Sequence, residues 1–96
     1  MEARLVSQQE IAEKVSGWKY IGNSIEKKFQ FKNFKTAFEF MTKVALVCEE
    51  MNHHPKWTNN YNQLLICLET HDQSAVTELD IELAQKIDQL FEENKA

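Results

Sequence analysis

Glycine, proline and cysteine are scarce in this chain, and each scarcity excludes a class of protein. Two glycines and one proline among 96 residues rule out collagen-like and low-complexity sequences. The two cysteines, Cys48 and Cys67, are too few for a disulfide scaffold and lack Cys-x-x-Cys spacing, so reduced thiols are expected. The apolar content of 43% and the charged content of 27% are typical of one globular domain, which we expect to span residues 1–96.

A long apolar run and an excess of basic side chains are also missing. The longest apolar run, residues 44–48, has five residues, whereas a membrane-spanning helix needs about 20. Residues 1–4 do not open a signal peptide, so a cytoplasmic location is predicted, or a nuclear one in a eukaryote. Eleven basic against fifteen acidic side chains give a net charge of −4, which argues against direct binding of nucleic acid through a basic surface.

Capping signals and alternating apolar side chains predict the first elements. Ser7 with Glu10 fits a capping box, which predicts a short helix over residues 8–15. Alternating apolar residues over 18–32, interrupted by a Gly-Asn turn, predict a hairpin with one buried face. Asn33 can then cap a long helix over residues 34–51.

Two apolar stripes run along the predicted helix 34–51. The stripe assigned to the core comprises Phe34, Ala37, Phe38, Met41, Ala45 and Cys48. The other stripe comprises Phe40, Val44, Val47 and Met51. Because one small sheet can cover only one arc of a helix, we predict that the second stripe is a subunit interface; the alternative is a wider buried face.

The second half of the chain repeats the pattern of hairpin and helix. Residues 57–62 and 64–70 read as two strands. Apolar side chains on both faces of the second strand predict that it is central in the sheet or pairs across a dimer. Thr77 with Asp80 indicates a capping arrangement at the start of a last helix. The order helix, hairpin, helix, hairpin, helix predicts an α+β fold, a two-layer sandwich.

The candidate chemical groups are the three histidines, which fall within nineteen residues. His53 and His54 lie in a polar loop after the long helix, and His71 closes the last strand. Glu49 lies one helical turn before the loop, and Asp80 opens the helix that follows His71, so a carboxylate is expected beside each site to hold an imidazole in one tautomer. One proton-donating and one proton-accepting imidazole are the minimum for an elimination of water.

Plainer interpretations of the same residues remain open at this point. Asp80 can be a simple helix cap, Glu49 a solvated charge and His71 a surface residue. Trp57 and Tyr61 can pack the hairpin or form an aromatic wall for a flat heterocycle. A metal site is disfavoured because no two histidines have the i,i+4 or i,i+2 spacing that places two rings on one ion. No nucleophile elbow, Gly-rich phosphate loop or His-Glu-x-x-His pair occurs.

The combined spacing resembles the signature of the pterin-4a-carbinolamine dehydratases. Its centre is the run Glu49-x-x-x-His53-His54-Pro55, followed by Tyr61, His71 and Asp80. Further similar segments are residues 29–34, 37–45, Trp57, Thr70-His71 and 80–84. The resemblance covers about residues 17–87, and the whole pattern is specific where a lone His-His-Pro would be weak.

The resemblance implies a fold, an assembly and a reaction. The fold is a four-stranded antiparallel sheet with three helices on one face, and family members pair their sheets into dimers and join dimers through the long helix. For this chain that implies a homodimer or homotetramer through the second stripe. The reaction converts 4a-hydroxytetrahydrobiopterin to quinonoid dihydrobiopterin and water during tetrahydrobiopterin recycling, without a metal or organic cofactor.

The resemblance also assigns roles to individual residues. His53 and His71 are the implied acid–base pair, and His54 in the same site orients the pterin and its leaving hydroxyl. The sequence does not say which imidazole is the acid. The residues implied to bind or orient the substrate are Glu49, Trp57, Thr70 and Asp80.

Two positions of this chain depart from the family pattern. Ala75 stands where relatives usually have glycine, so a positive φ there would either strain it by about 1 kcal/mol or require a rearranged loop. Glu69 stands where many relatives have a small polar residue, beside the substrate-facing Thr70, so substrate contacts are expected to differ in detail.

Two other functions compete with the dehydratase. One is an interaction module that binds the dimerisation helix of a transcription factor, and the other is a role in molybdopterin metabolism.

Overall fold

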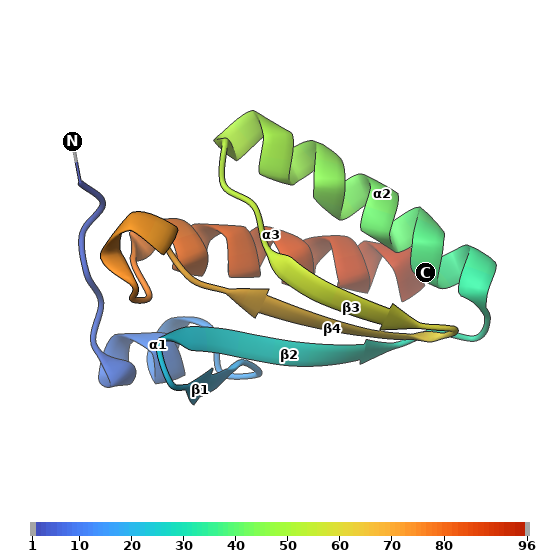
Figure 1. Cartoon of the computed structure of the whole chain (residues 1–96). Helices are drawn as coiled ribbons and strands as arrows, with labels where there is room; N and C mark the ends of the chain where they lie inside the picture. The colour runs from blue at the N-terminus through green and yellow to red at the C-terminus, as the bar shows by residue number, and fades with distance from the viewer. Residues whose placement is uncertain (1, 96) are drawn as a thin grey trace.

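The computed structural model describes residues 2–95 (Figure 1). Its elements in chain order are α1 (Gln8–Lys14), β1 (Lys19–Ile21), β2 (Ser24–Gln30), α2 (Phe34–Met51), β3 (Lys56–Asn60), β4 (Gln63–Leu68), the 3-10 helix η1 (His71–Gln73) and α3 (Glu78–Lys95). Both long helices and both hairpins lie where the sequence predicts them, whereas α1 ends at Lys14, one residue early. The order α-β-β-α-β-β-α is therefore confirmed. No helix within residues 2–95 is long and apolar enough to cross a membrane.

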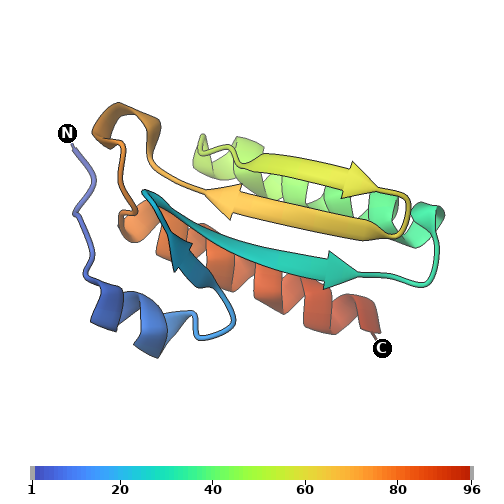
Figure 2. The same ribbon diagram turned by 60° about the horizontal axis from the view of Figure 1, so that its bottom comes forward.

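The four strands form one antiparallel sheet in the order β1-β2-β4-β3. The strand β4 is central, as its two apolar faces predict. Figure 2 shows α2 and α3 side by side behind one face of the sheet, and α1 contacts α3 beyond the short strand β1. The α+β class is confirmed, with helices in one layer and the sheet in the other.

The core lies between the sheet and the two long helices. Alternate side chains of the strands face the helices because successive residues of a strand point to opposite faces. The sheet contributes Ile25, Phe29, Leu64, Ile66 and Leu68, all at most 1% exposed. The last helix contributes Ile81, Leu83, Ala84 and Ile87. Full burial of each large side chain stabilises the fold by about 1.5–3 kcal/mol, and the same alternation leaves the other face of the sheet open for a site.

The helix α2 buries residues from both predicted stripes. Ala37 and Cys48 of the predicted core stripe are buried, as expected. Phe40 and Val44, assigned to a subunit interface, are fully buried, and Val47 and Met51 are partly buried against the same core. The Phe40 ring lies 5.4, 5.2 and 5.7 Å from the rings of three aromatic residues on β2, the segment after it, and α3: Phe29, Phe31 and Phe91. These rings come from other elements, and Phe40 is buried because it packs against them. The predicted interface stripe is therefore wrong, and the alternative of a wider buried face is what the structure shows.

An apolar arc of α2 faces solvent instead. Phe34 and Phe38, which we assigned to the core, are 46% and 54% exposed, and their rings stack with centroids 5.7 Å apart. Met41 and Ala45 of the same predicted stripe are half-buried, and Met41 packs against the core. We call the two exposed rings, Phe34 and Phe38, the outer arc of α2.

The loop between η1 and α3 differs from the expectation at Ala75. The left-handed residue there is Ser74, with φ of 49°, whereas Ala75 does not have a positive φ. The Ala75 carbonyl accepts the Thr70 N–H at 2.9 Å, which forms a short bridge that closes the loop. The condition for strain at Ala75 is therefore not met, because the neighbouring serine takes the conformation that favours glycine.

Candidate active site

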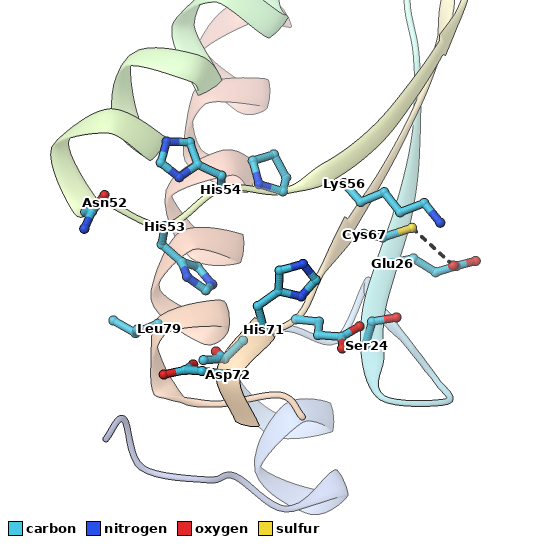
Figure 3. Close-up of a pocket in the computed structure, with 13 residues that line it drawn as sticks. Ser24, Glu26, Asn52, His53, His54, Lys56, Cys67, His71, Asp72 and Leu79 are labelled. Carbon is cyan, nitrogen blue, oxygen red and sulfur yellow. Dashed lines mark hydrogen bonds between the residues drawn. The ribbon is translucent and has the colours of Figure 1, made fainter. Parts of the chain in front are cut away.

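A cavity of about 640 Å³ opens where the loop after α2, the end of β4, η1 and the start of α3 meet. His53, His54 and His71 all line it, although His71 lies 17 positions after His54 in the chain (Figure 3). The predicted convergence of the histidines on one cleft is thus present in the structure.

The end of α2 explains why the adjacent histidines diverge. Asn52 caps the helix in the left-handed conformation with φ of 51°, which asparagine tolerates better than most residues. Its N–H donates to the Glu49 carbonyl at 3.2 Å, and the His53 N–H donates to the Cys48 carbonyl at 3.0 Å. The chain therefore leaves the helix abruptly, and the side chains of His53 and His54 meet different carboxylates.

The His53 ring turns inward to Asp80. Its Nε2 atom lies 2.5 Å from the Asp80 Oδ1 atom, and the two residues are 8% and 0% exposed. Asp80 lies in the first turn of α3, 27 residues further along the chain. This buried bond connects the loop after α2 to the helix that follows the sheet.

Asp80 is held by a chain of hydrogen bonds. Its Oδ2 atom accepts the Thr77 backbone N–H at 2.9 Å and the Thr70 hydroxyl at 2.9 Å. The Thr77 hydroxyl lies 2.6 Å from the Thr70 hydroxyl and must donate to it, because the single Thr70 proton already points to Asp80. The Thr77 hydroxyl oxygen also accepts the Leu79 N–H, so the predicted capping arrangement of Thr77 and Asp80 is confirmed.

This network fixes the tautomer of His53. A carboxylate can only accept hydrogen bonds, so the His53 Nε2 atom carries a proton. In the neutral imidazole the Nδ1 atom is then the unprotonated nitrogen. Any proton that His53 exchanges with a ligand must pass through Nδ1.

The second pair, His54 and Glu49, lies at the surface. The His54 Nε2 atom is 2.5 Å from the Glu49 Oε2 atom, and their side chains are 54% and 75% exposed. The pair stays close to the end of α2, which supplies Glu49, while His54 comes from the loop that follows. Water surrounds these charges, so their interaction orients the His54 ring more than it stabilises the fold.

His71 is the first residue of η1 and is exposed at the cavity. Asp80 was expected beside His71, but its two oxygens are occupied by His53, Thr70 and Thr77. Within residues 2–95 no carboxylate pairs with the His71 ring. The predicted placement of Asp80 is therefore wrong, and the His71 ring is free to meet a ligand.

Two predicted substrate-contacting residues have other surroundings. Trp57 pairs with Ile66 across β3 and β4, faces the helices and packs against the core, so the structure does not bring it to the cavity. Thr70 borders the cavity but is 5% exposed, and its hydroxyl is occupied by Asp80 and Thr77.

Sequence reasoning missed the sheet side of the cavity. Glu26, Lys56 and Cys67 line it from three neighbouring strands (Figure 3). The Cys67 thiol donates to the Glu26 Oε2 atom at 3.5 Å; burial raises the pKa of this thiol, and the bond to Glu26 raises it further. The sequence signal that could have located this side of the cavity is the second apolar face of β4, because Cys67 lies on it and so points away from the helices.

The described residues offer no obvious metal site. Among residues 2–95 no group of three or more His, Cys, Asp or Glu side chains is arranged to hold an ion. The carboxylates near the histidines are used as hydrogen-bond acceptors for single imidazole rings. Such an arrangement orients each of these two rings.

Comparison with known proteins identifies close relatives. A sequence model described as pterin 4 alpha carbinolamine dehydratase matches residues 4–90. A protein of Prochlorococcus marinus subsp. pastoris that carries this family's name is 48% identical over 84 residues, covering 88% of each chain. A protein of the same name from Sinorhizobium fredii is 46% identical over 91 residues, covering 93% of this chain and 85% of the relative.

Solved structures agree with the sequence comparison. A transcriptional coactivator/pterin dehydratase from Brucella melitensis matches with a TM-score of 0.84 at 38% identity, covering 91% of this chain and 98% of that chain. A pterin dehydratase-like protein identified as a RuBisCO assembly factor in the alpha-carboxysome matches with a TM-score of 0.63 at 20% identity. The match covers 76% of this chain and 84% of that chain. The second similarity concerns the fold alone.

Proposed function

This chain belongs to the pterin 4 alpha carbinolamine dehydratase family, and on that premise we propose that it removes water from 4a-hydroxytetrahydrobiopterin to give quinonoid dihydrobiopterin in tetrahydrobiopterin recycling. The observation that carries the proposal is the cavity on which His53, His54 and His71 converge, with His53 held by the buried Asp80. The cavity supplies two separate imidazoles to one bound molecule.

The reaction requires one acid and one base. Loss of water breaks the C4a–O bond, removes the proton from N5 and forms a C4a=N5 double bond. The hydroxyl leaves as water only after it gains a proton, and the N5 proton must be taken up elsewhere. Positioned proton transfer accelerates such a step by about 10²–10⁴-fold, and no covalent intermediate is needed.

The surroundings of each imidazole suggest its role. His53 is the base in this proposal, because Asp80 holds its Nε2–H, leaves Nδ1 to receive the N5 proton and stabilises the imidazolium that forms. His71 is the acid that protonates the leaving hydroxyl from the opposite segment of the cavity. His54, held by Glu49, orients the substrate.

The test is the rate of dehydration of freshly generated 4a-hydroxytetrahydrobiopterin, followed spectrophotometrically. We expect His53→Ala and His71→Ala each to lose about 10²-fold or more in kcat, and the double variant to fall to the uncatalysed rate. His54→Ala should lose about tenfold, as expected for an orienting group. Full activity in the double variant would refute these roles, and an inactive wild-type protein would refute the dehydratase.

The outer arc of α2 supports a second proposal, which concerns assembly. Stacked, half-exposed Phe34 and Phe38 form an apolar surface of the kind that is normally covered by a partner. We propose that copies of the chain join through this arc into a homodimer or homotetramer, in place of the buried stripe first predicted. Sedimentation velocity measures the assembly directly.

A foreign helix is the alternative occupant of the outer arc, since the Brucella melitensis relative is described as a transcriptional coactivator as well as a pterin dehydratase. An exchange experiment separates the two. A labelled amphipathic dimerisation helix should fail to displace copies of this chain if the arc serves self-association, and should form a mixed complex if the arc serves a transcription factor.

A further inference from the structure

The floor of the cavity is the open face of the sheet. Leu68 is buried against the helices, so its neighbours Cys67 and Glu69 point to the opposite face. The register places Glu26 of β2 and Lys56 of β3 on either side of Cys67, and all of these residues line the cavity (Figure 3). The floor is thus a sheet surface, against which a flat ring can lie.

Glu69 is a half-buried residue whose carboxylate has no protein partner in the described part of the chain. Glu26 on the same floor accepts the Cys67 thiol, and Asp80 accepts three hydrogen bonds. Within residues 2–95, by contrast, no N–H or O–H group donates to the Glu69 carboxylate and no cation pairs with it. Because no buried side-chain oxygen lacks a partner among these residues, the Glu69 oxygens reach the solvent of the cavity, where a ligand with N–H donors can meet them.

We propose that Glu69 is the specificity-determining residue of the cavity and accepts two hydrogen bonds from the 2-amino-pyrimidinone edge of a bound pterin. This inference rests on the proposed function. That edge presents two adjacent donors, the ring N3–H and the 2-amino N–H, and the two oxygens of one carboxylate match such a pair. A 2-oxo ring places a carbonyl oxygen against the carboxylate instead and is repelled.

The position of Glu69 along the chain agrees with the position of the reacting atoms. Thr70, with φ of −91° and ψ of 109°, is extended. The Cα atoms of Glu69 and His71, one on each side of Thr70, therefore lie about 6–7 Å apart. In a pterin, C2 lies across the pyrimidine ring from C4a. A ring held at C2 by Glu69 therefore extends C4a and N5 toward the histidines.

The experiment compares equilibrium binding of two stable ring systems, pterin and its 2,4-dioxo counterpart lumazine. We expect the wild-type protein to prefer pterin by at least about tenfold. Glu69→Gln, which has the same shape but only one acceptor, and Glu69→Ser should reduce this preference to about threefold or less. In the dehydration assay both variants should raise KM more than they lower kcat. The control is Glu39→Gln, the same change at an exposed site on α2 outside the cavity, and it should leave the preference unchanged.

The outcomes separate this inference from the proposed function. If the wild-type protein dehydrates its substrate and Glu69→Gln keeps the full preference for pterin over lumazine, the role of Glu69 is refuted while the dehydratase stands. If the preference depends on Glu69 but the wild-type protein does not accelerate dehydration, the role of Glu69 in recognising the ring is supported while the dehydratase is refuted. Circular dichroism of each folded variant accompanies both measurements.

Discussion

The Asp80 carboxylate lies 2.5 Å from the His53 ring and at the same time accepts the Thr77 N–H at the start of α3. One buried side chain therefore begins a helix and fixes the tautomer of an imidazole. The Thr70 hydroxyl, which donates to the same carboxylate, adds the end of the sheet to this connection. The geometry of the site is consequently part of the core structure.

Asp80→Asn should reverse the His53 tautomer. Thr70 and Thr77 both donate to this side chain, so the amide oxygen stays with them and the amide NH₂ faces His53. His53 must then accept at Nε2 and carry its proton on Nδ1, which cannot serve as the base. We expect kcat to fall about 10–100-fold and the free energy of unfolding to fall by about 1–3 kcal/mol. Kinetics and urea unfolding measure both. Glu82→Gln, the same kind of change on the exposed face of α3, should alter neither.

Glu49→Gln should have a much smaller effect. The side chains of His54 and Glu49 are 54% and 75% exposed, so water screens their interaction. We expect the free energy of unfolding to change by less than about 1 kcal/mol and kcat to fall by less than about tenfold. Losses as large as those of Asp80→Asn would contradict the view that this pair only orients the ring.

Phe38 and Phe40 should respond in opposite ways to substitution, although both lie on α2. Phe38→Glu places a charge on the outer arc, so we expect smaller assemblies in sedimentation with little change in thermal stability. Phe40→Ala removes a fully buried ring that contacts three other aromatic rings and should cost about 3–5 kcal/mol in unfolding free energy. The reverse pattern would restore the stripe first predicted from sequence.

The two thiols should differ in how a ligand protects them. Burial raises the pKa of Cys48 to about 11, so at pH 8 its thiol is protonated and alkylation of the folded protein should be very slow. Cys67, with a smaller rise in pKa, lines the cavity and should react faster. Pterin should slow the alkylation of Cys67 and leave that of Cys48 unchanged, as mass spectrometry of the modified peptides can show. Equal rates with and without pterin would place the ligand elsewhere.

Ser74→Gly should stabilise the loop before α3. Ser74 has φ of 49°, a conformation that glycine adopts without strain, so a gain of up to about 1 kcal/mol is expected. Ala75→Gly is the matched control, because Ala75 does not have a positive φ and glycine there only adds freedom to the unfolded chain. Thermal unfolding of the two variants measures the difference. If Ala75→Gly raised the stability and Ser74→Gly left it unchanged, the left-handed residue of the loop would be Ala75 and not Ser74.

The sequence predicted the parts of the fold that depend on local signals. Ser7, Asn33 and Thr77 each cap a helix whose first turn follows immediately, so their roles are visible within a few residues. The choice of the buried arc of α2 is not local. Both stripes are apolar, and Phe40 is drawn inward by aromatic rings on distant elements, so spacing alone could not distinguish them.

The candidate site, like the fold, was predictable only where it depends on local sequence signals. Spacing located His53, His54 and His71, and Asp80 was found as a cap beside them. The partner of Asp80 could not be predicted, because the direction of the His53 ring depends on the left-handed turn at Asn52. Glu26 and Lys56 come to the cavity only through the pairing of their strands with β4, which no local pattern specifies.

The opposite directions of the adjacent histidines have a consequence for biogenesis. The partner of His54 lies five residues away on the helix just completed, whereas the partner of His53 lies 27 residues downstream. A nascent polypeptide can thus form the first contact as soon as α2 has emerged from the ribosome, but it lacks the second until α3 has been synthesised and docked. A chain that is truncated before α3, or in which α3 has not docked, would have the His54 ring held by Glu49 but the His53 ring without Asp80. Only the complete fold holds both rings.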